Sequence, residues 1–126
     1  MKTDYLNLYL YIYIDYKEIK MFVSGDVLKI NYGAFDHYGI YTENGTVIHN
    51  SKKNKKVEET SIERFSENNK ILVSSIKSEN PALTVQTARK YLNIPYSLFS
   101  DNCEHFVRMS CGLVKESTQV IRRQLT

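Results

Sequence analysis

Apolar and polar residues alternate strictly near the start of the chain. From Leu6 to Ile14 every even position is aliphatic, whereas the odd positions hold Asn7 and three tyrosines. A period of two predicts a β-strand with one buried face. The segment is too short to cross a membrane and lacks the small-residue cleavage site of a signal peptide. Two interpretations stay open: residues 1–20 supply an extra strand that completes the sheet, or they are a leader before a domain that spans 21–126.

The rest of the chain alternates between strand and helix patterns. The predicted elements are strands at 27–32 and 70–77 and helices at 61–68, 80–93 and 117–125. The strand at 70–77 should direct Ile71, Val73 and Ile76 inward. Asn80 and Pro81 are typical of an N-cap followed by the first helical position. At 126 residues the chain has room for one hydrophobic core, so we expect a single domain.

A hairpin is predicted between the segments that carry His37 and His49. Both segments are rich in β-branched and aromatic residues, and Asn44-Gly45 lies between them. A two-residue turn would send the two histidines to opposite faces of the sheet. A three-residue loop at 43–45, with Gly45 in the left-handed conformation, would place them diagonally on one face with Gly39 between them. We expect the second register.

Cys103 follows a run of turn-forming residues and begins a predicted helix that Gly112 is placed to end. Unpaired N–H groups and the positive end of the helix dipole favour thiolate over thiol at such a position. Thiolate is the nucleophilic form, so we expect a reactive cysteine. The alternative is a small buried apolar residue, since free cysteines are often buried.

A nucleophile needs a base, and the chain contains three histidines. His105 is two residues beyond Cys103 on the same helix, so its side chain points away from the cysteine and is expected to be structural. His37 and His49 are the better candidates for a base. Taken singly, each of them is more often a structural residue than a functional one.

Four short motifs in this chain have the order and spacing found in the lecithin:retinol acyltransferase family. The motifs are Gly25-Asp26-Val27-Leu28, His37-Tyr38-Gly39-Ile40-Tyr41, Val47-Ile48-His49 and Asn102-Cys103-Glu104-His105-Phe106-Val107. The chain is especially similar to the small phospholipase/acyltransferase branch of that family. The resemblance covers about 23–122, nearly the whole chain.

The resemblance implies a permuted papain-like α+β fold, in which an antiparallel sheet with both histidines packs on a C-terminal helix that starts at the cysteine. It implies that Cys103 is the nucleophile, His37 the general base and His49 the third member that orients His37. The expected activity is acyl transfer or phospholipase cleavage through a thioester. A cysteine peptidase or amidase, and a non-catalytic interaction module, stay open as alternatives.

Two positions depart from the pattern of the branch. A basic residue usually precedes the first histidine and tryptophan follows it, whereas this chain has Asp36 and Tyr38. An acidic neighbour is expected to raise the pKa of His37, which would favour an imidazolium–thiolate pair or weaken the base. The departure concerns the choice of lipid headgroup more than the core chemistry.

The net charge of +3, from 17 basic and 14 acidic residues, does not indicate nucleic-acid binding. Four lysines nonetheless cluster shortly after His49, at Lys52, Lys53, Lys55 and Lys56. The loop is either simply solvated or a foothold on anionic lipid, where each lysine adds ~1 kcal/mol. No aromatic residues are interleaved with the lysines, as a nucleic-acid site would require.

Cys103 and Cys111 are eight residues apart on the predicted helix, about 12 Å and too far for a disulfide. Free thiols indicate a reducing compartment. We therefore expect a cytoplasmic, soluble protein, at most peripheral to membranes, that needs no cofactor. A zinc site made of Cys103, His37 and His49 is the chemical rival to a triad, although the chain has no C-x-x-C pair.

Overall fold

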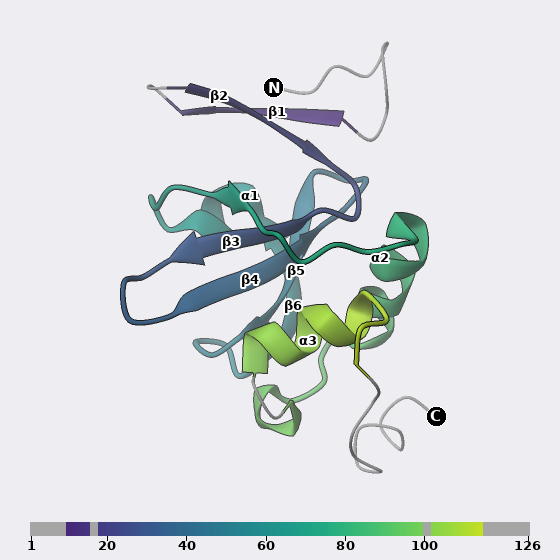
Figure 1. The fold of residues 1–126 in the computed structure, drawn as a ribbon. Coiled ribbons are helices and arrows are strands. Elements are labelled where there is room, and N and C mark those ends of the chain that lie inside the picture. The colour runs from purple at the N-terminus through teal and green to yellow at the C-terminus, as the bar shows by residue number, and fades with distance from the viewer. Residues whose placement is uncertain (1–9, 16–17, 100–101, 115–126) are drawn as a thin grey trace.

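The structure, a computed structural model, describes residues 10–15, 18–99 and 102–114. The described part has an α+β fold, as predicted, with five antiparallel strands in the order β6-β5-β4-β3-β7 (Figure 1). The strands are β1 (Leu10–Asp15), β2 (Glu18–Val23), β3 (Val27–Asn31), β4 (Asp36–Tyr41), β5 (Thr46–Ser51), β6 (Lys56–Ser61) and β7 (Leu72–Val73). The helices are α1 (Ile62–Ser66), α2 (Pro81–Lys90) and α3 (Asn102–Ser110), with a 3-10 turn, η1 (Tyr96–Leu98), before α3.

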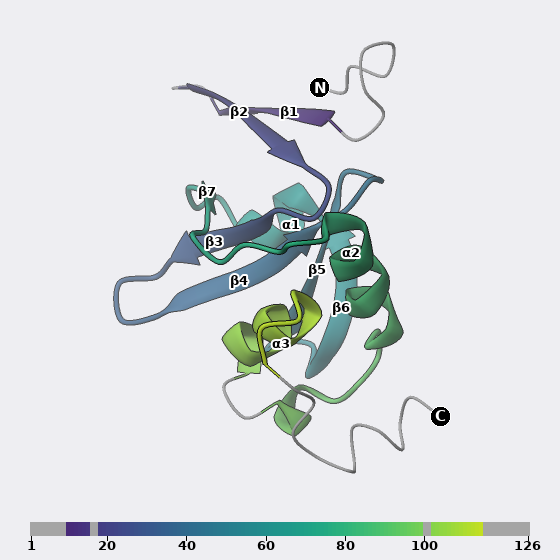
Figure 2. The same ribbon diagram turned by 45° about the vertical axis from the view of Figure 1, so that its right-hand side comes forward.

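Both faces of the main sheet are buried, each against its own hydrophobic core. Successive side chains on a strand point to opposite faces, so neighbouring residues belong to different cores. On β4, Ile40 belongs to the core that α2 and α3 cover, whereas Tyr41 belongs to the core that includes α1. Ile48 and Val47 on β5 divide in the same way. Figure 2 shows α2 and α3 together on one side of the sheet. Cys103 thus approaches the sheet on the face opposite α1.

The hairpin between β4 and β5 has the predicted register. The Thr42 amide donates to the Thr46 carbonyl at 2.9 Å, which closes a three-residue loop. Gly45 has a φ of 74°, a left-handed conformation that favours glycine. His37 and His49 therefore lie on one face of the sheet.

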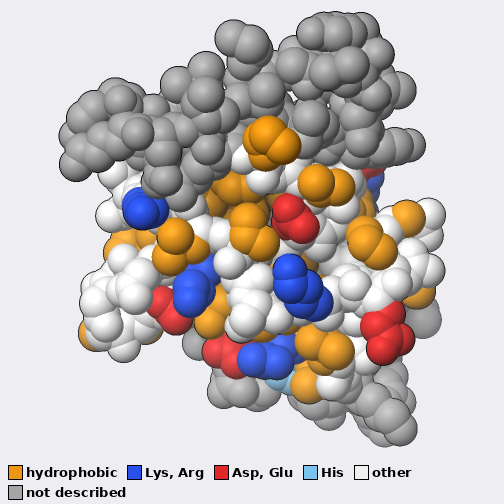
Figure 3. Space-filling model, turned by 45° about the horizontal axis from the view of Figure 1, so that its top comes forward, with side chains coloured by type: hydrophobic (Ala, Val, Ile, Leu, Met, Phe, Trp, Pro, Cys, Tyr) orange, Lys and Arg blue, Asp and Glu red, His pale blue; other side chains and the backbone are white. Residues whose placement is uncertain are grey.

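The N-terminal alternation forms a strand in its described part, β1, but this strand does not complete the main sheet. It pairs with β2 in a two-stranded sheet of its own, visible at the top of Figure 1. Figure 3 looks partly from this side and shows acidic, basic and apolar side chains interspersed on the described surface. This mixture agrees with the mild net charge.

The strand predicted at 70–77 is much shorter in the structure. β7 pairs with β3 over two residues, so the pleat does not fix the alternation along the whole segment. Ile71 and Ile76 are buried as predicted. Val73 is 46% exposed, and the prediction that it points inward is wrong.

The helices begin and end largely where the sequence predicts. The side chain of Asn80 caps α2 by accepting from the Leu83 amide at 3.1 Å, and α2 ends at Lys90, earlier than predicted. After α3, Gly112 has a φ of 78° and its amide donates to the Met109 carbonyl at 3.0 Å, as in a Schellman cap. The helix predicted at 117–125 lies outside the described residues. Within those residues, every helix is too short or too polar to traverse a bilayer.

Candidate active site

Cys103 lies in the first turn of α3 and is partly buried. Its thiol donates to the main-chain carbonyl of Asp36, with Sγ and the oxygen 3.6 Å apart. Asp36 immediately precedes His37 in β4. The start of α3 therefore meets β4 at the point where the strand carries the first histidine.

A gap in the sheet makes room for this contact. The β4–β5 ladder covers Ile40 and Tyr41 and does not reach the start of β4 within the described sheet. His37 pairs with β3 on the other side. Because main-chain groups alternate in direction along a strand, the Asp36 carbonyl and the Tyr38 amide face the gap. The sulfur of Cys103 lies where a partner strand would otherwise run.

Burial raises the pKa of the Cys103 thiol, and this effect exceeds the opposing effect of nearby amides. The main-chain N–H groups of Tyr38, Cys103 and Glu104 face the sulfur and lower the pKa, as expected at a helix start. The amides at the helix start thus favour the thiolate as predicted, but burial, which the sequence prediction did not include, outweighs them. The thiol is neutral in the resting protein and needs a base to become a nucleophile.

The two predicted site histidines contact each other directly. Nε2 of His37 and Nδ1 of His49 are 2.8 Å apart in a hydrogen bond. Both rings pack on Phe65 of α1, each with its centroid 5.4 Å from the phenyl centroid. A Cβ on Gly39 would come within 2.9 Å of the Phe65 ring. The absence of a side chain at Gly39 thus allows the Phe65 ring to pack against both imidazoles.

Burial lowers the pKa of both histidines from 6.5 to about 4. For His37, the neighbouring His49 lowers the pKa further, and the Glu67 carboxylate opposes the shift. The expected rise in the pKa of His37 is wrong: burial lowers the pKa, and the carboxylate that opposes this shift is that of Glu67 instead of Asp36. Both imidazoles are neutral at physiological pH, and a neutral imidazole has the free lone pair that a base requires.

A carboxylate that the sequence analysis did not single out completes this row of side chains. Nε2 of His49 lies 3.1 Å from Oε2 of Glu58 on the neighbouring strand β6. Asn54 holds the same carboxylate, since its Nδ2 donates to both oxygens at 2.8 and 3.0 Å. The segment at 56–61 could have been recognised as a strand, but the residue of that strand that pairs with His49 depends on the turn before it.

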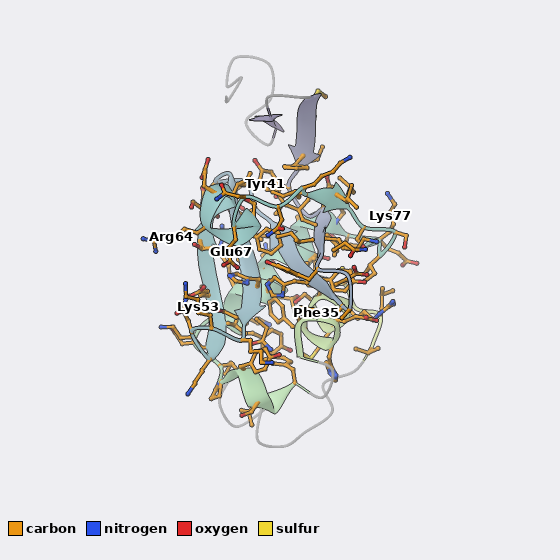
Figure 4. All side chains as sticks on the ribbon, turned by 90° about the vertical axis from the view of Figure 1, so that its left-hand side faces the viewer. Phe35, Tyr41, Lys53, Arg64, Glu67 and Lys77 are labelled. Atoms are coloured by element: carbon orange, nitrogen blue, oxygen red, sulfur yellow. The ribbon has the colours of Figure 1, made fainter. Side chains whose placement is uncertain are left out.

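A cavity of about 670 Å³ opens over the cysteine. It is lined by Phe35, Asp36, His37, Tyr38, Lys52, Tyr96, Cys103 and Glu104. A second cavity shares Phe35, His37 and Lys52 with the first and continues to His49. Figure 4 shows Phe35 beside α3 and Lys53 on the opposite side of this region. His37 and Cys103 therefore border one space, which the cationic loop reaches from the edge.

The remaining sequence candidates do not join this site. His105 is buried and packs against Phe99, with the ring centroids 6.0 Å apart, as a structural side chain would. Cys111 follows the last residue of α3 and, like Cys103, is a free thiol. The zinc alternative finds no support in the described part of the chain, where no three His, Cys, Asp or Glu side chains are grouped to hold a metal ion.

Comparison with known proteins identifies the family to which the chain belongs. The profile described as lecithin retinol acyltransferase matches residues 20–114, and the chain belongs to this family. No curated protein sequence matches it significantly. At the level of the family, the protein is an acyltransferase or phospholipase-type thiol enzyme that acts on lipid acyl substrates.

Proposed function

We propose that the protein cleaves an acyl ester of a phospholipid through a thioester on Cys103 and passes the acyl group to water or an amine. The observation that carries this proposal is that the ring of a neutral His37 borders the cavity into which the Cys103 thiol opens. Nε2 of His37 is hydrogen-bonded to His49, which leaves Nδ1 of His37 to accept the proton of the Cys103 thiol. A hydrogen bond between Cys103 and His37 during turnover remains a prediction.

In the proposed first step, Nδ1 of His37 takes the thiol proton while Sγ attacks the ester carbonyl carbon. The carbonyl electron pair moves to oxygen, and N–H groups at the start of α3 stabilise that oxyanion. Such a donor is typically worth ~3–4 kcal/mol. When the electron pair returns, the carbon–oxygen ester bond breaks and the imidazolium gives its proton to the departing lysophospholipid oxygen. Water or an amine then attacks the thioester with His37 as base, the carbon–sulfur bond breaks, and the imidazolium returns its proton to the Cys103 sulfur.

Phospholipid turnover by three proteins tests this proposal. We expect Cys103→Ser to abolish release of fatty acid and lysophospholipid with little change in thermal stability. Cys111→Ser is the matched control and should retain nearly full turnover, since Cys111 lies at the other end of α3. Undiminished turnover by Cys103→Ser would contradict the proposal. Cleavage of soluble peptides or amides but of no lipid would instead support a cysteine amidase.

We further propose that the Lys52–Lys56 loop brings the site to anionic membranes. Lys52 and Lys53 border the cavities beside the histidines, and Phe35, 62% exposed, lies at the same rim. Four lysines at ~1 kcal/mol each give weak binding that salt screens.

Co-sedimentation with vesicles tests this foothold. Binding should require anionic lipid, weaken at high salt and disappear when Lys52, Lys53, Lys55 and Lys56 are changed to Glu. Binding that ignores both salt and these substitutions would refute the foothold.

We also propose that the domain responsible for this chemistry spans 21–126, with the strand β1 outside it. The family match, which begins at residue 20, supports this boundary. Two free thiols support a reducing, cytoplasmic setting.

A further inference from the structure

We propose that Glu58 is a positioning residue that fixes the tautomers of His49 and His37, so that Nδ1 of His37 is left unprotonated and open to Cys103. This inference rests on the proposed role of His37 as base. It concerns a residue on β6 that neither the family motifs nor the sequence analysis assigns, and it follows from three consecutive contacts.

The first contact fixes Glu58 as an acceptor. Nδ2 of Asn54 donates to Oε1 at 2.8 Å and to Oε2 at 3.0 Å, so the carboxylate is held by a donor on both oxygens. The main-chain N–H of Asn54 donates to Oγ of Ser51 at 3.0 Å, which anchors the turn to the end of β5. An ionised carboxylate has no proton to give. Whatever else contacts Glu58 must therefore be a donor.

The second contact is the one to His49. Nε2 of His49 lies 3.1 Å from Oε2 of Glu58, so this nitrogen carries the imidazole proton. A neutral imidazole has one N–H, and Nδ1 of His49 is then an acceptor. The opposite tautomer would set a lone pair against a carboxylate in a buried place, which costs a hydrogen bond and adds repulsion.

The third contact transmits this choice to His37. Nδ1 of His49, now an acceptor, lies 2.8 Å from Nε2 of His37, which must supply the proton. His37 is neutral as well, so its Nδ1 bears the free lone pair. The carboxylate on β6 thus sets the state of a base two side chains away, as the aspartate does in a Ser-His-Asp triad.

Other charged groups surround this row without replacing Glu58. Lys53, Glu63, Arg64 and Glu67 line, with His49 and Glu58, a cavity of about 390 Å³ on that side of the sheet. Glu67 accepts from the Tyr32 hydroxyl at 3.4 Å and raises the pKa of His37 through space. Within this group of charged residues, Glu58 is the one whose carboxylate contacts an imidazole nitrogen, Nε2 of His49.

Nitrogen-15 NMR of the full chain, which distinguishes the two histidine tautomers by chemical shift, tests the inference at pH 7. We expect the Nε2–H form for both His37 and His49. In Glu58→Gln, whose amide can donate or accept, His49 should become a mixture and kcat should fall roughly tenfold or more with KM little changed. An Nδ1–H form of His49 in the unmodified protein would overturn the inference even if Glu58→Gln failed to fold.

Glu59→Gln is the matched control, because Glu59 neighbours Glu58 on β6 and is similarly exposed, at 22% against 21%. Its carboxylate contacts Thr46 and Arg89 instead of the histidines. This variant should keep both tautomers and kcat. Glu58→Gln with unchanged tautomers and unchanged kcat would refute the inference. Since NMR needs no substrate, expected tautomers in a protein without acyl-transfer activity would refute the proposed function alone.

Discussion

At the scale of single residues, the central feature is a pair of neutral groups. Burial keeps the Cys103 thiol protonated and keeps His37 unprotonated at physiological pH. The proposed mechanism therefore requires a proton to move from the Cys103 sulfur to a His37 nitrogen when substrate binds. The alternative resting state is a thiolate beside an imidazolium, as in some other cysteine enzymes.

Alkylation of Cys103 by iodoacetamide distinguishes these two resting states. In a Cys111→Ser background, where Cys103 is the only thiol, the rate should be low at pH 7. It should rise by about tenfold per pH unit until the raised pKa is reached, because only thiolate reacts. The rate constant would be followed by intact mass. A plateau from pH 5 upward would indicate a preformed thiolate and contradict the neutral pair.

At the scale of elements, the β4–β5 hairpin and α1 hold the histidines together. The two rings and Phe65 fill the space above Gly39, and the three-residue loop sets the register. A Cβ at position 39 would lie 2.4 Å from Cγ1 of Val47. The hairpin therefore depends on the absence of a side chain at one point.

The Gly39→Ala substitution tests this dependence. The added methyl group should lower the free energy of unfolding by ~1–3 kcal/mol through overpacking, measured by urea denaturation. In a Val47→Ala background, where the closest clashing atom is missing, the same substitution should cost clearly less. Equal costs in both backgrounds would show that the contact with Val47 is unimportant.

The sequence was sufficient for elements whose signals are local. Gly45, suited to a left-handed loop position, and Gly39, which leaves room for two imidazoles, predicted the hairpin register, and Asn80 predicted the start of α2. The 70–77 strand failed because an edge pairing of two residues imposes little alternation, which no local pattern reveals.

The candidate site divides in the same way. The positions of Cys103, His37 and His49 followed from motifs, whereas the direction of the thiol pKa shift depends on burial that only tertiary packing creates. The pairing of His49 with Glu58 depends on the turn between β5 and β6. In that turn Lys55 has a φ of 62°, a left-handed conformation that lysine rarely adopts and that its presence in a sequence does not predict.

At the scale of the whole molecule, the buried histidines link stability to pH. Their folded pKa values of about 4 lie below the ordinary 6.5, so the unfolded chain takes up protons first as the pH falls. Stability should be fully present above pH 6.5 and decrease from there towards pH 4. Each histidine adds a slope of about 1.4 kcal/mol per pH unit within this window.

Urea denaturation across this pH range measures the effect. A variant with both His37→Gln and His49→Gln should lose most of the slope between pH 6.5 and 4. The ion pair of Glu43 with Arg89 affects a lower range, because the pKa of Glu43 lies below 4.5 and its contribution is lost only beneath that. An unchanged slope in the double variant would show that the histidines are not buried in their neutral form.

The most direct test of the whole account is a search for the acyl-enzyme itself. The protein would be mixed with a phospholipid carrying an isotope-labelled acyl chain, quenched in acid, and examined by intact and peptide mass spectrometry. The account predicts one labelled acyl group, attached to the peptide that contains Cys103 and released by hydroxylamine, as a thioester is. Turnover of the lipid with no adduct on Cys103, or with the same label in Cys103→Ser, would contradict it.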